Sequence, residues 1–166
     1  MTETEEDRAQ RMITTIRMMQ LHPKRCLDYG CGRGWLLRSL QVYHNAYAMG
    51  VEWQDVDPPA VVKEIVETKE EVTGTFDLIT CIRRLSSAEE IRWMAERLTP
   101  GGTILIEEET SWLKPILDRV GMPHLFINQG KFSQSFIGSN YGESRAERVV
   151  ETVELTREEG GVWYGR

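Results

Sequence analysis

The sequence has 166 residues, of which 40% are hydrophobic and 28% charged, and its formal net charge is −6 at pH 7. These values favour one globular domain with a substantial core, and no apolar run approaches the ~20 residues of a membrane span. The negative charge argues against broad non-specific nucleic-acid binding, and the polar, acidic residues 1–11 do not resemble a signal peptide. The cysteines Cys26, Cys31 and Cys81 form no CxxC pair, which favours buried thiols in a reduced, cytoplasmic protein without a metal site.

Alternating helix and strand patterns fill the first third of the chain. Residues 4–21 carry apolar side chains at helical spacing, acidic residues in the first turn, and Pro23 just beyond the end. The predicted elements that follow are a strand at 25–29, a helix at 34–43 and a strand at 46–53.

Residues 57–72 allow two interpretations. Asp57-Pro58-Pro59 is typical of an N-cap followed by proline in a first turn, and apolar residues then recur at near-helical spacing. We therefore predict a helix here. An extended alternative stays open, because most residues of 61–66 are β-branched.

The second half continues the alternation and then changes character. We predict a buried strand at 76–82, a helix at 87–98 capped by Ser87 and Glu90, a turn at 99–102, a strand at 103–107 and a helix at 111–120. Residues 122–142 show little periodicity, and residues 148–156 and 161–166 are predicted to pair as an antiparallel hairpin. This order predicts an α/β protein with helices on both faces of a mostly parallel sheet.

The most informative segment is D-Y-G-C-G-R-G, Asp28 to Gly34, between the first strand and its helix. Glycines allow positive φ and close ligand approach, and a helix N-terminus behind them offers free N–H groups. A dinucleotide fingerprint needs glycine at position 35, which is Trp35, and no G-K-[ST] follows for a P-loop. The ligand is therefore expected to be polar and different from a dinucleotide.

This segment resembles the first motif of the class I S-adenosylmethionine-dependent methyltransferases. Glu52 at the end of the second strand, Phe76-Asp77 in the fourth and Pro100-Gly101-Gly102 before the fifth also match family positions. The resemblance implies a Rossmann-like three-layer sandwich, S-adenosyl-L-methionine as cofactor and a single domain over 1–166. This single domain would comprise an N-terminal helix (1–22), a cofactor-binding core (25–110) and a substrate-side and hairpin region (111–166).

The cofactor-binding residues that the resemblance implies are Asp28, Gly30, Cys31, Gly32, Gly34, Glu52, Trp53 and Cys81. Asp28 would accept from the cofactor ammonium, with help from the backbone carbonyl near Cys81, and Glu52 from the ribose hydroxyls. Trp53 would lie against adenine. The alternatives are a helix-capping role for Asp28, an ordinary surface acid at Glu52, and core or lid packing for Trp53. Cys31 looks reactive inside the turn but is expected to fill tight space without thiol chemistry.

The chain also departs from the family pattern. Only 24 positions separate Glu52 from Phe76, so either the intervening helix or the edge strand is reduced, and Glu67, Glu70 and Glu71 are unranked candidates for the acid that reads adenine. The N-P-P-Y motif of amino-methylating nucleic-acid enzymes is missing after the fourth strand. Its absence favours a small-molecule acceptor over nucleic acid. Arg83 and Arg84 stand at that position, and they belong to a solvated loop or hold an anionic substrate.

The favoured function is methyl transfer to a small acceptor, contacted by residues 107–112 and 122–142. His124, Lys131 and Tyr141 are weaker candidates for substrate contacts. No catalytic base is identified, and a transfer that mainly positions an intrinsically nucleophilic acceptor needs none. The alternative is a non-catalytic S-adenosylmethionine-binding or regulatory protein, while Trp35 disfavours a nicotinamide oxidoreductase.

Overall fold

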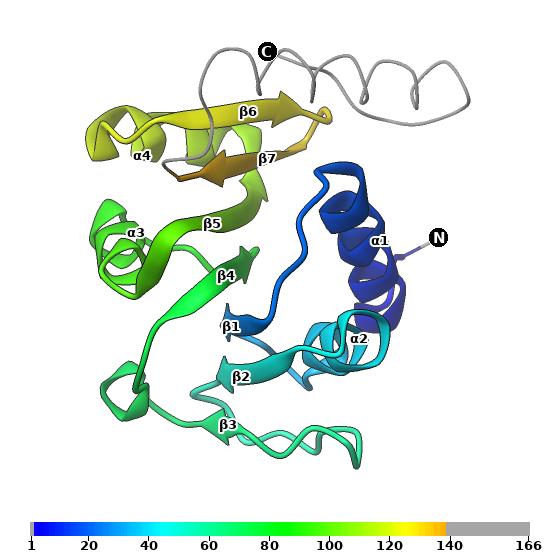
Figure 1. Ribbon diagram of the computed structural model, residues 1–166. Coiled ribbons are helices and arrows are strands. Elements are labelled where there is room, and N and C mark those ends of the chain that lie inside the picture. The colour runs from blue at the N-terminus through cyan, green and yellow to red at the C-terminus, as the bar shows by residue number, and fades with distance from the viewer. Residues whose placement is uncertain (1, 139–166) are drawn as a thin grey trace.

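The computed structural model describes residues 2–138, which form one seven-stranded sheet with helices on both faces (Figure 1). The sheet order is β3-β2-β1-β4-β5-β7-β6. The strands are β1 Arg25–Tyr29, β2 Tyr47–Val51, β3 Ile65–Val66, β4 Phe76–Ile82, β5 Leu98–Glu109, β6 His124–Asn128 and β7 Phe132–Ile137. Strands β1 to β5 pair in parallel, and β7 pairs antiparallel with β5 and β6. The predicted Rossmann-like three-layer sandwich is confirmed.

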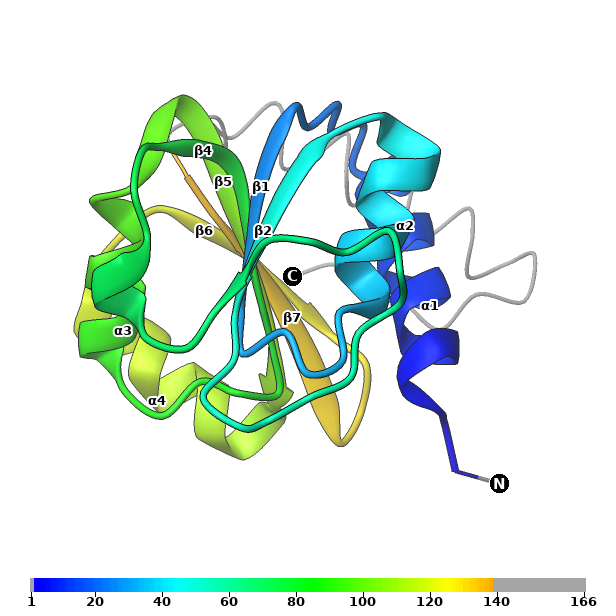
Figure 2. The same ribbon diagram turned by 90° about the horizontal axis from the view of Figure 1, so that it is seen from below.

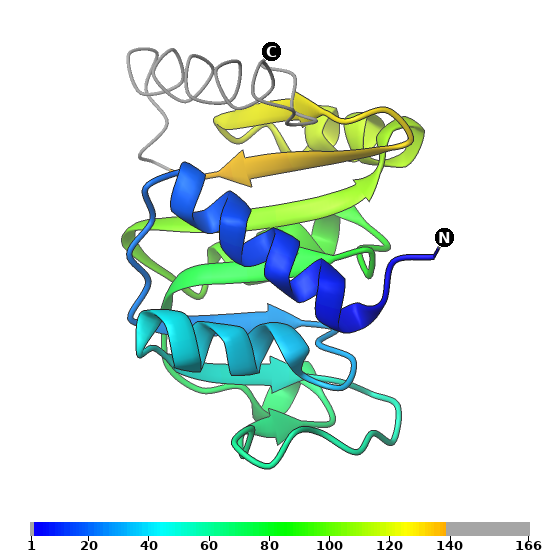
Figure 3. The ribbon, with the colours of Figure 1, turned by 90° about the vertical axis from the view of Figure 1, so that its right-hand side faces the viewer.

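The helices divide between the two faces of the sheet. They are α1 Glu5–Met18, α2 Trp35–His44, α3 Ala88–Ala95 and α4 Thr110–Val120, with a short 3-10 helix η1 at Lys69–Glu71. Helices α1 and α2 cover one face and α3 and α4 the other (Figure 2), and α1 crosses the middle of the sheet (Figure 3). Each face has its own core, with Met12, Ile16 and Leu37 in the first and Phe76, Ile91 and Met94 in the second.

Local signals set the boundaries of several elements. Thr4 and Asp7 form a capping box at the start of α1, and Ser87 and Glu90 form one at the start of α3, as the sequence predicts. The C-cap of α4 is Gly121, with a φ of 67°. Across residues 2–138, no helix combines the length and apolar character that a membrane crossing requires.

The helix predicted over residues 57–72 is wrong, and the extended alternative for 61–66 holds only at Ile65–Val66. This segment contains only β3 and η1. Strand β3 pairs with β2, because the backbone carbonyls of Glu64 and Val66 accept from the N–H groups of Gly50 and Glu52. Two consecutive prolines and a β-branched run weaken the helix, and the free edge of β2 offers hydrogen-bond partners. The edge strand and the crossover helix are therefore both reduced.

The irregular interpretation of residues 122–142 is also wrong for their described part. Strands β6 and β7 form the antiparallel hairpin of the fold there. The sequence did not predict strand β7, because a buried strand is expected to be apolar and β7 carries the polar run Ser133-Gln134-Ser135. The hairpin predicted over 148–166 lies outside the described residues. The predicted turn at 99–102 interrupts β5, which pairs with β4 at Leu98 and again from Thr103 onward.

Candidate functional site

The glycine turn lies at the carboxyl edge of β1, the edge at which parallel α/β sheets bind ligands. The backbone N–H groups of Gly30 and Cys31 donate to the carbonyl of Val51 at 2.8 and 3.0 Å, which holds the turn against the end of β2. Gly30, Gly32 and Gly34 have φ values of 75°, 57° and 91°. Such left-handed backbone strains any residue with a Cβ, so the turn keeps its path and its open backbone only with glycine.

Asp28 lies buried beneath this turn at the junction of β1 and β4. The hydroxyl of Thr80 donates to its Oδ1 atom at 2.8 Å. Burial raises the pKa of Asp28 to about 7, although the Thr80 hydrogen bond opposes the shift. Gly34 is the N-cap of α2 and no side chain caps the helix, so Asp28 is not the capping acid.

Each oxygen of the Glu52 carboxylate accepts two hydrogen bonds. Oε1 accepts from the backbone N–H of Gly32 at 2.7 Å and from Arg84 Nη1 at 2.7 Å. Oε2 accepts from the backbone N–H of Gln54 at 3.1 Å and from Arg84 Nη2 at 3.0 Å. Burial opposes ionisation, yet the Arg84 and backbone hydrogen bonds hold the pKa of Glu52 below its ordinary value. Because a carboxylate has about four lone-pair positions, Glu52 is saturated.

Arg84 therefore lies across the glycine turn. A Cβ atom built on Gly30 would stand 2.6 Å from Arg84 Cβ. The Arg84 guanidinium carbon lies 4.2 Å from the centroid of the Trp53 ring, which is 49% exposed. This cation–π contact and the pair with Glu52 fix the arginine between the two strand ends.

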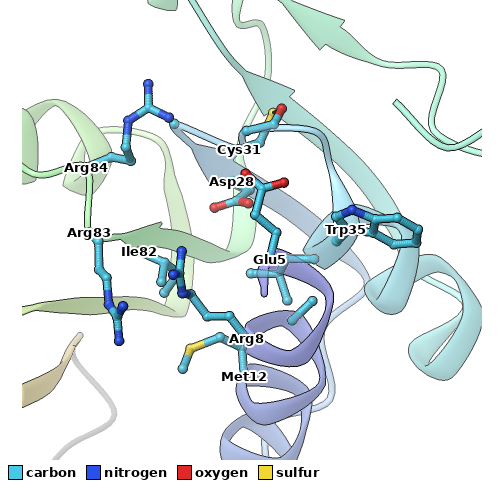
Figure 4. A pocket seen from close by; sticks show the side chains of 13 residues that line it. Glu5, Arg8, Met12, Asp28, Cys31, Trp35, Ile82, Arg83 and Arg84 are labelled. Atoms are coloured by element: carbon cyan, nitrogen blue, oxygen red, sulfur yellow. Dashed lines mark hydrogen bonds between the residues drawn. The ribbon is translucent and has the colours of Figure 1, made fainter. Parts of the chain in front are cut away.

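Two cavities meet at this pair. The first, of about 230 Å³, lies between α1 and the strand ends, and Figure 4 shows Asp28 beside Glu5 there, with Arg83 and Arg84 pointing to opposite sides. Its lining includes Glu5, Arg8, Met12, Asp28, Gly30, Cys31, Gly32, Arg83 and Arg84. The second, of about 510 Å³, is lined by Glu52, Trp53, Lys63, Ile65 and Glu67 among others. Arg84 belongs to the wall of the first and Glu52 to that of the second.

A second ionic group lies beside the first cavity. The fully buried Glu107, near the end of β5, accepts from Arg11 at 2.6 and 3.0 Å, from Arg83 at 3.0 Å and from the Gln134 amide at 3.1 Å. Burial opposes the charge, but these hydrogen bonds hold the pKa of Glu107 below its usual value. Glu107 is thus an ionised anchor that fixes two arginines at this edge of the sheet.

A family model described as a methyltransferase domain matches residues 2–153. This chain belongs to the methyltransferase-domain family. The resemblance to a methyltransferase family seen in the sequence is confirmed at the level of the family. A search of the curated proteins found no significant match.

Solved structures share the fold of this methyltransferase domain. DesVI from Streptomyces venezuelae matches with a TM-score of 0.62 at 10% identity, over 82% of this chain and 93% of its own. A Mesorhizobium loti S-adenosylmethionine-dependent methyltransferase matches at 0.60 and 13% identity, over 80% and 97%. The T. thermophilus 16S rRNA methyltransferase RsmC matches at 0.62 and 18% identity, over 83% of this chain. The domain spans 43% of the RsmC chain and 48% of a matched Thiobacillus denitrificans methyltransferase.

Most of the predicted site residues of this methyltransferase domain come together. Asp28, Gly30, Cys31 and Gly32 line the first cavity, and Glu52 and Trp53 line the second. Gly34, at the start of α2, lines neither of these cavities and lies against Val62. Cys31 fills space, because a Cβ on Gly50 would stand 2.5 Å from its Sγ atom. Burial raises the pKa of the Cys31 thiol, in keeping with a packing role. The Cys81 side chain points into the core on the α3 and α4 face.

The remaining candidate residues lie in different parts of the structure. Glu67 lines the second cavity, whereas Glu71 is used in the cap of η1. His124 lies in a different groove, between α4 and β6, and Tyr141 lies outside the described residues.

The interpretation of Arg83 and Arg84 as a solvated loop is wrong, because both pair with buried carboxylates. Sequence reasoning also missed Glu5, Arg8 and Arg11, which α1 brings to the site. Their spacing of three residues places them on neighbouring turns of one helix face. This spacing is the sequence feature that could have identified a charged face on α1. The sequence could not show that this face meets the carboxyl edge of the sheet.

Proposed function

We propose that this domain binds S-adenosylmethionine across the two cavities and transfers its methyl group to a small-molecule acceptor. The observation that carries the proposal is the glycine turn with Asp28 below it and Glu52 beside it, at the meeting point of both cavities. The cofactor, when bound, supplies an electrophilic methyl group on a sulfonium centre. The chain's own task is to hold that group in line with the acceptor.

The residues present fit such a cofactor. Asp28 and Glu5 give the first cavity two carboxylates, which suits an ammonium and a neighbouring sulfonium. Glu52 would accept from vicinal ribose hydroxyls, and Trp53 and Glu67 would meet the adenine in the second cavity. The glycines at positive φ carry no side chain, so the backbone of the turn is accessible to the ligand.

Ribose binding at Glu52 requires a change at Arg84. All four acceptor positions of Glu52 are in use, and Arg84 holds two of them. Two ribose hydroxyls can bind there only if they replace the guanidinium. Arg84 therefore competes with the nucleoside part of the cofactor.

Replacing Arg84 with leucine should tighten the binding of 5′-methylthioadenosine, a probe with the ribose hydroxyls but no carboxylate. We expect about a tenfold gain, the scale of one charge-assisted hydrogen bond to Glu52. Isothermal titration calorimetry measures the gain. Arg92→Leu is the matched control, since Arg92 pairs with the exposed Glu89 on α3. Equal or weaker binding by the Arg84 variant would show that the ribose does not use Glu52.

The first cavity supports a small acceptor, because α1 closes it on one side and residues 82–84 on the other. Matched structures include an rRNA methyltransferase and a ribosomal protein L11 methylase, so acceptors differ in class within the fold. The three described cysteines are free and buried, which supports the prediction of a reducing, cytoplasmic location.

The short segment 57–72 also favours a second candidate, a non-catalytic cofactor-binding or regulatory protein, because it contains only β3 and η1 where a helix was expected. Calorimetry with S-adenosylmethionine and S-adenosylhomocysteine tests both candidates, and we expect both ligands to bind. Production of S-adenosylhomocysteine with a panel of small acceptors then distinguishes them. If neither cofactor form binds, both candidates fail, and binding without turnover on any acceptor supports the second.

A further inference from the structure

Three arginines converge on the carboxylate of Glu3 beside the first cavity. Arg11 donates to Glu3 with Nε at 2.8 Å and Nη2 at 3.1 Å, and Arg8 Nε donates at 3.2 Å. Arg83 Nη2 lies 3.7 Å from the same carboxylate. We call Arg8, Arg11 and Arg83 the arginine cluster. It holds one carboxylate in a side-on, two-point contact with Arg11, which is the strongest geometry for such a pair.

Contacts other than those with Glu3 hold two members of the arginine cluster in place. Glu107 pairs with both Arg11 and Arg83, and the Arg83 guanidinium carbon lies 3.6 Å from the centroid of the Phe132 ring. Arg11 and Arg83 therefore keep their positions whether or not Glu3 is present. A preorganised arginine fork loses little conformational entropy when it binds a carboxylate.

Glu3 is more exposed than Glu107. It lies before α1, outside any helix or strand, and its side chain is 30% exposed, whereas that of Glu107 is fully buried. The capping box of α1 uses Thr4 and Asp7, so α1 keeps its N-cap without the Glu3 contacts. If Glu3 leaves, Arg8 loses the carboxylate with which it pairs, and Arg11 and Arg83 share the single carboxylate of Glu107. The arginine cluster then has donors available for another carboxylate.

We propose that the arginine cluster is a carboxylate-binding subsite for the methyl acceptor, and that Glu3 occupies it until the acceptor's carboxylate replaces it. Arg8 and Arg83 also line the first cavity, whose far wall is Asp28 and the glycine turn. An acceptor anchored at the arginine cluster would therefore extend toward the methyl donor. This inference rests on the proposed function, and it names the acceptor class as small carboxylic acids.

The experiment titrates benzoate, and benzamide as its uncharged isostere, into the protein saturated with S-adenosylhomocysteine. Glu3→Gln should bind benzoate about tenfold more tightly than the unaltered protein, and benzamide should not discriminate between them. Glu6→Gln is the matched control, because Glu6 is an exposed acid in the first turn of α1. Adding Arg8→Met to Glu3→Gln should remove part of the gain, because one of the three guanidiniums is lost. Arg8 is the preferred second site because its hydrogen bond is to Glu3 rather than to Glu107.

Equal benzoate affinity of Glu3→Gln and Glu6→Gln would overturn the proposal. The cofactor's own carboxylate is the competing ligand, and 5′-methylthioadenosine distinguishes it. If benzoate binds Glu3→Gln beside 5′-methylthioadenosine but not beside S-adenosylhomocysteine, the subsite serves the cofactor and the acceptor assignment fails. Benzoate binding to the unliganded protein is measured as well. That result reports on the arginine cluster even if S-adenosylhomocysteine does not bind, so the two failures are distinguishable.

Discussion

Asp28→Asn is expected to stabilise the protein above pH 7 while weakening the binding of S-adenosylhomocysteine. The pKa of Asp28 is raised to about 7 by burial, from an ordinary value of 3.8. Between these values the native state holds a proton that the unfolded chain has lost, so stability falls as pH rises through this window. An asparagine carries no charge to bury, and we expect a gain of up to about 4 kcal/mol at pH 8. The gain should vanish near pH 4.

Urea unfolding of both proteins at pH 4, 6 and 8 measures this gain. The Asp118→Asn variant, at an exposed position of α4, controls for the change in net charge. We expect S-adenosylhomocysteine to bind the Asp28 variant about 10- to 100-fold more weakly, since a charged acceptor for its ammonium is lost. A pH-independent stability difference would contradict the raised pKa of the buried Asp28 carboxyl.

Glu107→Gln should destabilise the protein by about 3 kcal/mol at pH 7. The buried carboxylate balances Arg11 and Arg83, and removing one partner of a buried ion pair leaves charge without compensation. We place the effect at the lower end of the usual range because both arginines retain some exposure. The pH dependence runs opposite to that of Asp28. The pKa of Glu107 is lowered, so its stabilisation is present above about 4.5 and is lost as pH falls below that value.

Urea unfolding at pH 7 and pH 4 tests this prediction. Glu89→Gln is the control, because Glu89 pairs with Arg92 on the exposed surface of α3 and should change stability by less than about 0.5 kcal/mol. If the two variants lose equal stability at pH 7, Glu107 is not the anchor of the arginines.

The elements that could be predicted from the sequence are those whose signals are local. The apolar run of β4, the capping box at Ser87 and Glu90, and the glycine turn after β1 each depend on residues within a few positions of one another. The same holds for the placement of Asp28 and Glu52 at strand ends, because parallel strands bring their carboxyl ends to one edge.

The errors arose where neighbours in space outweighed neighbours in sequence. Residues 57–72 have helical spacing, but the open edge of β2 supplies hydrogen bonds that favour the extended β3. The polar run of β7 has no strand signature, and it becomes a buried strand because β5 and β6 pair with it on both sides.

The sequence by itself determined the family and the glycine turn that is proposed to hold the cofactor, since these follow from short motifs that impose backbone shape. Only the tertiary structure decided what surrounds that turn. It brought Arg84 onto Glu52, and it placed Arg8 and Arg11 of α1 beside Arg83 at the end of β4. Ion pairs between residues up to 96 positions apart depend on how a helix packs across the sheet, and no periodicity in the chain encodes that packing.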